Sequence, residues 1–134
     1  MKASKGEEKI IKILQKEKIP FIREKTFCDL HAGKFRYDFF LPKKKIALEV
    51  DGMQHFARVD YFQKSRTDFL RQQENDRRKN SYCLANQISL YRIPYWDLDK
   101  INSFSDICID EYKVKNRYHN DYLWRKHQID GSFS

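Results

Sequence analysis

The sequence predicts an α/β fold in which a mixed β-sheet is flanked by helices, with elements in the order α-β-β-β-α-β. Apolar residues recur at helical spacing near the start, and short apolar or alternating runs of strand character follow. A tight turn joins two of these strands, which predicts an antiparallel pair, and a long helix precedes the last strand, which predicts a parallel one. With 134 residues the chain fits one domain, which we divide into a core over residues 1–98 and a helical, basic extension over residues 99–134.

The first helix is predicted over residues 5–18. Ser4 is a suitable N-cap, and Glu7 three residues later completes a capping box. Pro20 requires the helix to end before it. Glu7 lies one turn before the apolar stripe of this helix, so we expect its side chain to face inward. The stripe consists of Ile10, Ile11 and Leu14.

Three strands should follow, over residues 21–27, 36–41 and 46–51. Residues 28–34, which include Gly33, have the composition of a turn. The segment Pro42-Lys43-Lys44-Lys45 is expected to form a tight, basic hairpin turn, so the second and third strands should pair antiparallel.

A second helix, strongly polar, is predicted over residues 64–85, and Pro94 ends a short alternating strand over residues 88–93. Because this helix connects the third strand to the fourth, the two should be parallel neighbours with a right-handed connection. We expect one more helix over residues 105–114. The tail after Lys115 mixes basic and aromatic residues, which suits either stacking on nucleic-acid bases or packing on the sheet.

The composition favours a polyanionic partner. The chain has 27 Lys and Arg against 19 Asp and Glu, a net charge of +8, and neutralising phosphates releases bound counterions. A lysine-rich surface that only maintains solubility is the alternative. Three cysteines without a CxxC pair argue against a disulfide scaffold, and no segment resembles a membrane span or a signal peptide. We therefore expect a cytoplasmic protein of a bacterium or a phage-infected cell, without a membrane partner.

Three carboxylates predict a metal site. Glu49 and Asp51 alternate along one strand and so project to the same face, at the end of an otherwise apolar run. Asp38 lies on the neighbouring strand among bulky apolar residues. Like charges side by side in such surroundings are unfavourable unless a cation binds them, and oxygen ligands suit Mg²⁺, for which Mn²⁺ can substitute. Solvated strand-end carboxylates are the simpler alternative. Gly52 would allow the backbone to turn sharply beside a ligand.

Three further residues are candidates for catalysis. His55, in the loop after the third strand, could act as a general acid or base or contact phosphate. Asp76 and Lys79 are three apart and share a helix face, where they could add a ligand and stabilise a phosphate, or form a surface ion pair. Basic residues of the second predicted helix should contact phosphates. These are Lys64, Arg66, Arg71, Arg77 and Arg78.

Over residues 5–98 the chain resembles the PD-(D/E)XK nuclease superfamily, in particular the very-short-patch-repair-like endonucleases of bacteria and phages, with their EDxHD-type site. The order and spacing of five segments carry the resemblance. They are Gly6-Glu7 with the apolar stripe after it, Arg36-Tyr37-Asp38-Phe39-Phe40-Leu41-Pro42, Ala47-Leu48-Glu49-Val50-Asp51-Gly52-Met53-Gln54-His55, Glu74-Asn75-Asp76-Arg77-Arg78-Lys79 and Leu90-Tyr91-Arg92-Ile93-Pro94-Tyr95.

The resemblance implies a restriction-endonuclease-like core and a site built from a helix, two strands and a crossover helix. Glu7 would join the site, Asp38 would be the central metal ligand, and Glu49 and Asp51 would form the second acidic motif. His55 and Asp76 would correspond to the branch's histidine and late aspartate.

The chain departs from the superfamily pattern at one position. Asp51 stands where a PD-(D/E)XK enzyme has its lysine, and Lys79 is the natural replacement. The mismatch-nicking members have histidine there, so their mechanism is not transferred whole. Their structural zinc is not expected here, because Cys28 and His31 have suitable spacing but Cys83 and Cys108 make a poor second half.

The sequence thus predicts a Mg²⁺-dependent deoxyribonuclease, an endonuclease or nickase that would leave 5′-phosphate ends, as the superfamily does. The metal ligands would be Glu7, Asp38, Glu49 and Asp51. Two alternatives stay open: a nucleic-acid-binding module that has lost catalysis, and a nuclease subunit directed to DNA by a partner. A homodimer is compatible with each of them.

Overall fold

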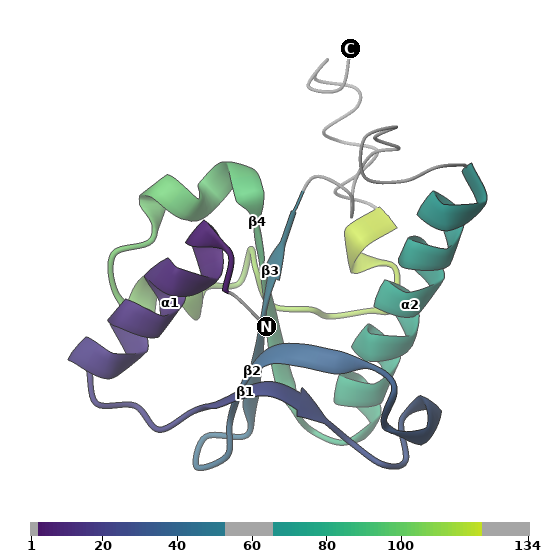
Figure 1. The fold of residues 1–134 in the computed structure, drawn as a ribbon, viewed down its shortest axis with the longest axis horizontal. Helices are drawn as coiled ribbons and strands as arrows, with labels where there is room; N and C mark the ends of the chain where they lie inside the picture. Colours follow the sequence, from purple (N-terminus) through teal and green to yellow (C-terminus); the bar gives the residue numbers. More distant parts are fainter. Residues whose placement is uncertain (1–2, 53–65, 122–134) are drawn as a thin grey trace.

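A computed structural model of the chain describes residues 3–52 and 66–121. A sheet stands at the centre, with a long helix on one face and shorter helices on the other (Figure 1). In chain order the elements are α1 (Lys5–Lys16), β1 (Ile22–Thr26), η1 (His31–Gly33), β2 (Arg36–Leu41), β3 (Ile46–Asp51), α2 (Arg66–Ala85), β4 (Ser89–Pro94), η3 (Tyr95–Lys100) and α3 (Phe104–Ile107).

The four strands form one mixed sheet in the order β1-β2-β3-β4. β1 and β3 each pair antiparallel with β2, and β4 pairs parallel with β3 across the α2 crossover. The predicted α-β-β-β-α-β order and mixed sheet flanked by helices are therefore confirmed. β2 and β3 have the predicted bounds, and the turn at residues 42–45 separates them as expected.

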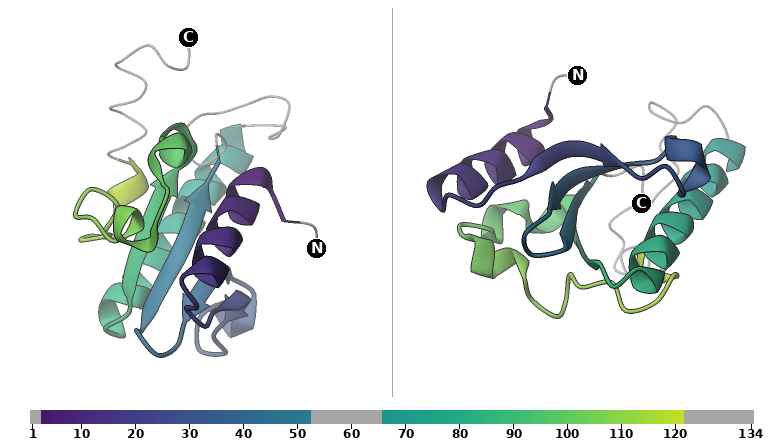
Figure 2. Two further views of the ribbon diagram at one scale, coloured as in Figure 1. Left: turned by 90° about the vertical axis from the view of Figure 1, so that its left-hand side faces the viewer. Right: turned by 90° about the horizontal axis from the view of Figure 1, so that it is seen from below.

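Each face of the sheet supports its own apolar cluster. On one face α1 packs against the strands. Ile10, Leu14, Phe39, Leu48 and Ile93 are buried between the helix and the sheet. On the other face lies α2 (Figures 1 and 2), whose Cys83 is buried together with Tyr37, Ala47, Leu90 and Val114. Since side chains alternate along a strand, Glu49 and Asp51 project with Ala47 toward α2.

The start of α1 has the predicted capping box: Glu7 N donates to Ser4 Oγ, and Ser4 N donates to a Glu7 carboxylate oxygen. Gly6 allows the helix to approach the sheet closely. A Cβ there would lie 2.9 Å from side-chain atoms of Val50 and Leu98, so any larger residue would push the helix away. Glu7 therefore starts on the face opposite to α2.

The helix predicted over residues 105–114 is present only at its start. α3 ends at Ile107, and residues 112–114 run along the outer edge of β4 instead. Arg92 N donates to Tyr112 O at 2.9 Å, and Val114 N donates to Leu90 O at 2.8 Å. Tyr112 and Val114 are buried on either side of exposed Lys113, an alternation typical of a strand. This path brings residues 115–121 over the α2 face. No helix in the described ranges is long and apolar enough to span a membrane.

Candidate active site

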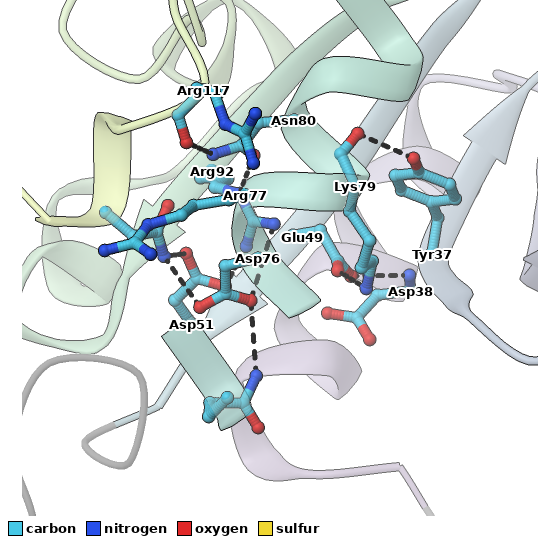
Figure 3. Close-up of polar contacts among 12 residues, drawn as sticks. Tyr37, Asp38, Glu49, Asp51, Asp76, Arg77, Lys79, Asn80, Arg92 and Arg117 are labelled. Atoms are coloured by element: carbon cyan, nitrogen blue, oxygen red, sulfur yellow. Dashed lines mark hydrogen bonds and ion pairs between the residues drawn. The ribbon is translucent and has the colours of Figure 1, made fainter. Parts of the chain in front are cut away.

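The β2–β3 ladder opens at Asp38 and Glu49. Its register runs from Leu41 opposite Ile46 to Phe39 opposite Leu48 and ends there. Beyond that point carboxylates replace the backbone pairing. Asp38 N donates to Glu49 Oε2 at 2.8 Å, and Val50 N donates to Asp38 Oδ2 at 2.7 Å. These reciprocal bonds hold two carboxyl groups from neighbouring strands side by side (Figure 3).

Lys79 reaches this pair from α2. Its ammonium forms an ion pair with Glu49 Oε1 and donates to Arg36 O. Tyr37 supports the lysine at both ends: its hydroxyl donates to Lys79 O at 2.8 Å, and its ring centroid lies 5.0 Å from Nζ. The side chains of Lys79 and Glu49 are only 12% and 4% exposed, so the ion pair is largely shielded from water.

The two carboxyl groups have opposite pKa shifts. Burial and repulsion by Glu49 raise the pKa of Asp38 to about 9, against a backbone bond from Val50 that lowers it. For Glu49, burial alone would raise the pKa, but the charges of Lys79 and Arg92 outweigh it and lower the pKa. Without a bound cation, Glu49 is therefore ionised at neutral pH while Asp38 holds a proton.

A second polar group lies around Arg92, whose side chain is fully buried. Its Nη1 donates to Asp51 Oδ1 at 2.8 Å and its Nε to Asn80 Oδ1 at 2.7 Å, and Nη2 lies 3.6 Å from Asp76 Oδ1. Burial would lower the pKa of this guanidinium, but the carboxylates of Asp51 and Asp76 raise it above its usual value. Arg92 is also the β4 partner of Glu49, so the two groups are neighbours on one face.

The C-terminal segment completes this second group. Asn120 Nδ2 donates to Asp51 Oδ2 at 2.9 Å and lies 3.4 Å from Asp76 Oδ2. His119 is held neutral beside it, because burial and the charge of Arg92 lower its pKa to about 4. Arg77 fixes the segment to α2 through Asp121, with 3.1 Å between Nε and Oδ2.

The structure thus divides the predicted site residues into two groups. Asp38, Glu49 and Lys79 form the first, and Asp51 and Asp76 meet around Arg92 in the second. Glu7 is in neither. Its carboxylate accepts from Arg23 Nη2 at 3.0 Å and from the N-cap, on the α1 face.

The predicted set of four metal-binding carboxylates is therefore not assembled around one point. In the described ranges no three Asp, Glu, His or Cys side chains lie close enough to share an ion. His55 and Lys64 lie outside the described residues.

Basic side chains lie along α2 and the segment beside it. Arg71, exposed, is 3.4 Å from Asp68, and Arg78 Nε donates to Glu74 Oε1 at 3.3 Å. Tyr118, 52% exposed, has the guanidinium groups of Arg77 and Arg117 each 5.5 Å from its ring centroid. A hollow of about 390 Å³ adjoins them. Its lining is Leu30, His31, Glu74, Arg78, Ser81, Tyr82 and Arg117.

Sequence reasoning missed the residues that organise the second group. Arg92 could have been found, because it lies two residues after Leu90 in the strand and so shares the face that the crossover helix buries. Asn80 lies four residues after Asp76 and so shares its helix face. Asn120 has no comparable signal, since its position depends on the path of residues 112–121 along β4.

Comparisons with known proteins give one limited similarity. The uncharacterized protein 307L of Invertebrate iridescent virus 6 is 34% identical over 58 residues, which are 43% of this chain and 29% of that protein. The chain thus matches less than a third of the viral protein. No protein family and no solved structure matches the chain significantly.

Proposed function

We propose that the chain is a metal-dependent DNA endonuclease or nickase with a restriction-endonuclease-like core. The observation that carries the proposal is the group Asp38–Glu49–Lys79: two carboxyl groups at a gap between strands, with a shielded ammonium against one of them. The same three residue types would serve a PD-(D/E)XK site, with the lysine on the crossover helix rather than on the strand.

The donor set suits Mg²⁺ or Mn²⁺. Mg²⁺ commonly takes only one or two protein carboxylates and completes its shell with water and phosphate oxygens. Asp38 and Glu49 are held side by side by reciprocal backbone bonds, and burial together with repulsion by Glu49 raises the pKa of Asp38. A divalent ion would replace the proton of Asp38 and remove that repulsion. When bound, it would supply activation of a water and stabilisation of phosphodiester charge.

Lys79 would stabilise the negative charge that develops on the phosphate. An ammonium has three donor protons, and Arg36 O and Glu49 accept two of them. Within residues 3–52 and 66–121 no other group accepts from it, so the third proton would serve a phosphate oxygen or the attacking water. Because Glu49 and the ring of Tyr37 hold the ammonium, little rearrangement is needed when the substrate arrives.

The net charge of +8 and the basic side chains along α2 favour DNA as the substrate. Arg71 and Arg78 of the predicted set are exposed, and Arg117 extends this basic surface. Arg77 is paired with both Asp121 and Glu74, so we assign it to holding the C-terminal segment.

Nicking of supercoiled plasmid DNA tests the proposal. Wild-type protein should convert it to open circles or linear DNA with Mg²⁺ or Mn²⁺ and not with EDTA. Asp38→Asn and Lys79→Gln should each lower the rate by at least about 100-fold. Lys12→Gln, which removes an exposed lysine of α1 on the opposite face, is the matched control and should keep full activity.

The same experiment separates the alternatives. A binding module would retain DNA without cutting it at any metal concentration, and a partner-directed subunit would cut only when its partner is added. Wild-type protein that nicks no DNA, with both site variants binding DNA as the wild type does, would refute the proposal.

A further inference from the structure

The two polar groups share one face of the sheet, and the charges of their described side chains can be added. Four carboxylates are present, one each from Asp38, Glu49, Asp51 and Asp76. Two cations accompany them, Lys79 and Arg92. With every carboxyl group ionised, the described side chains of the two groups carry a net charge of −2. The nearby pair of Arg77 with Asp121 adds none.

The Asp51 and Asp76 carboxylates already have a cation between them. Arg92 contacts one oxygen of each, and Asn120 Nδ2 approaches the other oxygen of each, at 2.9 Å and 3.4 Å. Gln72 Nε2 also donates to Asp76 Oδ1, at 3.2 Å. Arg92 has no exposed surface, and a guanidinium stays charged in proteins.

We propose that Arg92 is a built-in cation that occupies the place of a second metal ion, so that the site binds one divalent ion, at Asp38 and Glu49. One divalent ion brings the net charge of these described side chains to zero. A second would leave an excess of two positive charges beside a buried guanidinium, where screening by water is weak. This inference rests on the proposed function, because it assumes that the carboxylates of the first group hold a metal.

Arg92 is on this view a positioning residue. It fixes Asp51 and Asp76 as ionised groups that shape the electrostatic field at Glu49, and neither carboxylate coordinates the ion. The arrangement also explains how the charge of the site remains balanced although aspartate stands at the superfamily's lysine position. Asp51 adds a negative charge to the site, and Arg92, its neighbour through Nη1, neutralises it.

Isothermal titration of the full chain with MnCl₂, without DNA, tests the number of ions. The wild type should bind one Mn²⁺ per chain. Asp38→Asn should weaken this binding by more than about 100-fold because it removes a direct ligand. Asp51→Asn, the matched substitution in the second group, should weaken it less, by at most the about 10- to 100-fold typical of groups that only surround a metal's ligands.

Arg92 variants give a second, independent readout. Arg92→Gln removes the internal cation, so a second Mn²⁺ should bind, and Arg92→Lys should retain one. Circular dichroism establishes that each variant is folded; if Arg92→Gln does not fold, the wild-type stoichiometry and the Asp38 and Asp51 variants decide alone.

The outcomes distinguish this inference from the proposed function. Two ions in the wild type, or equal losses for Asp38→Asn and Asp51→Asn, would overturn the inference and leave metal-dependent cleavage standing. No Mn²⁺ binding by the wild type would overturn the proposed function and this inference with it.

Discussion

The carboxyl group of Asp38 connects the stability of the protein to pH. Its pKa of about 9 lies above the ordinary value of 3.8, so the folded protein holds this proton more tightly than the unfolded chain does. The stabilisation is complete below about pH 3.8 and is lost as the pH rises toward 9. Asp38→Asn cannot ionise and should avoid this loss, so its stability should exceed that of the metal-free wild type by a margin that grows by about 1.4 kcal/mol per pH unit between the two pKa values.

Urea unfolding in EDTA at several pH values measures this difference. The gap between wild type and Asp38→Asn should widen from pH 5 to pH 8 and narrow when Mg²⁺ is added to the wild type. Asp110→Asn, a matched substitution at an exposed carboxylate paired with Lys115, should not show this trend. A gap that does not change with pH would contradict the raised pKa.

At the scale of elements, the segment along β4 connects the surface of the molecule to the buried Arg92. Val114→Pro removes the N–H that donates to Leu90 O, and should destabilise the protein by about 2–4 kcal/mol. Because Asn120 and Asp121 follow this segment, their contacts with Asp51 and Arg77 should loosen as well.

The Nε–H of Arg92, which donates to Asn80, reports on this loosening by NMR. Its exchange with water should be slow in the wild type and much faster in Val114→Pro. Val114→Ala keeps the backbone donor and shortens only the side chain, so it should retain slow exchange. Equal exchange in the proline variant would show that residues 112–114 do not hold the second group together.

Local patterns predicted the elements whose neighbours in space are also neighbours in sequence. Capping by Ser4, the hairpin between β2 and β3, and alternation in β3 each depend on a few adjacent residues. The same alternation placed Glu49 and Asp51 on one face correctly. The helix predicted over residues 105–114 ends early, at Ile107, because burial of Tyr112 and Val114 against β4, a contact made at long range, overrides local helical preference.

The same distinction between local patterns and long-range contacts applies to the site. Asp38, Glu49 and Lys79 could be proposed together from motif and spacing, and the structure brings them into contact. The position of Glu7 could not be predicted from its inward orientation, since inward on α1 means the face opposite to α2. Arg92 and Asn120 complete the second group only through the parallel pairing of β4 and the path of residues 112–121.

For the whole molecule, one face of the sheet unites the polar groups with the basic surface of α2 and the C-terminal segment, while α1 covers the apolar other face (Figure 2). The basic residues expected to bind DNA therefore lie on the α2 side of the molecule. Substrate phosphates should be held on the side where Arg78 and Arg117 lie, and the exposed lysines of α1 should contribute little.

The dependence of DNA affinity on salt measures this asymmetry. For duplex DNA, each phosphate contact adds about 0.9 to the slope of log affinity against log salt concentration. Fluorescence anisotropy with the Asp38→Asn protein, which should bind without cutting, gives that slope.

Arg78→Gln and Arg117→Gln should each lower this slope by about 0.9, the value of one phosphate contact, and should weaken binding at low salt. The reason is that both guanidinium groups are about half exposed beside the hollow. Lys12→Gln changes the net charge equally on the α1 side and should leave the slope unchanged. If all three variants reduce the slope alike, the attraction comes from total charge and no face of the molecule is preferred.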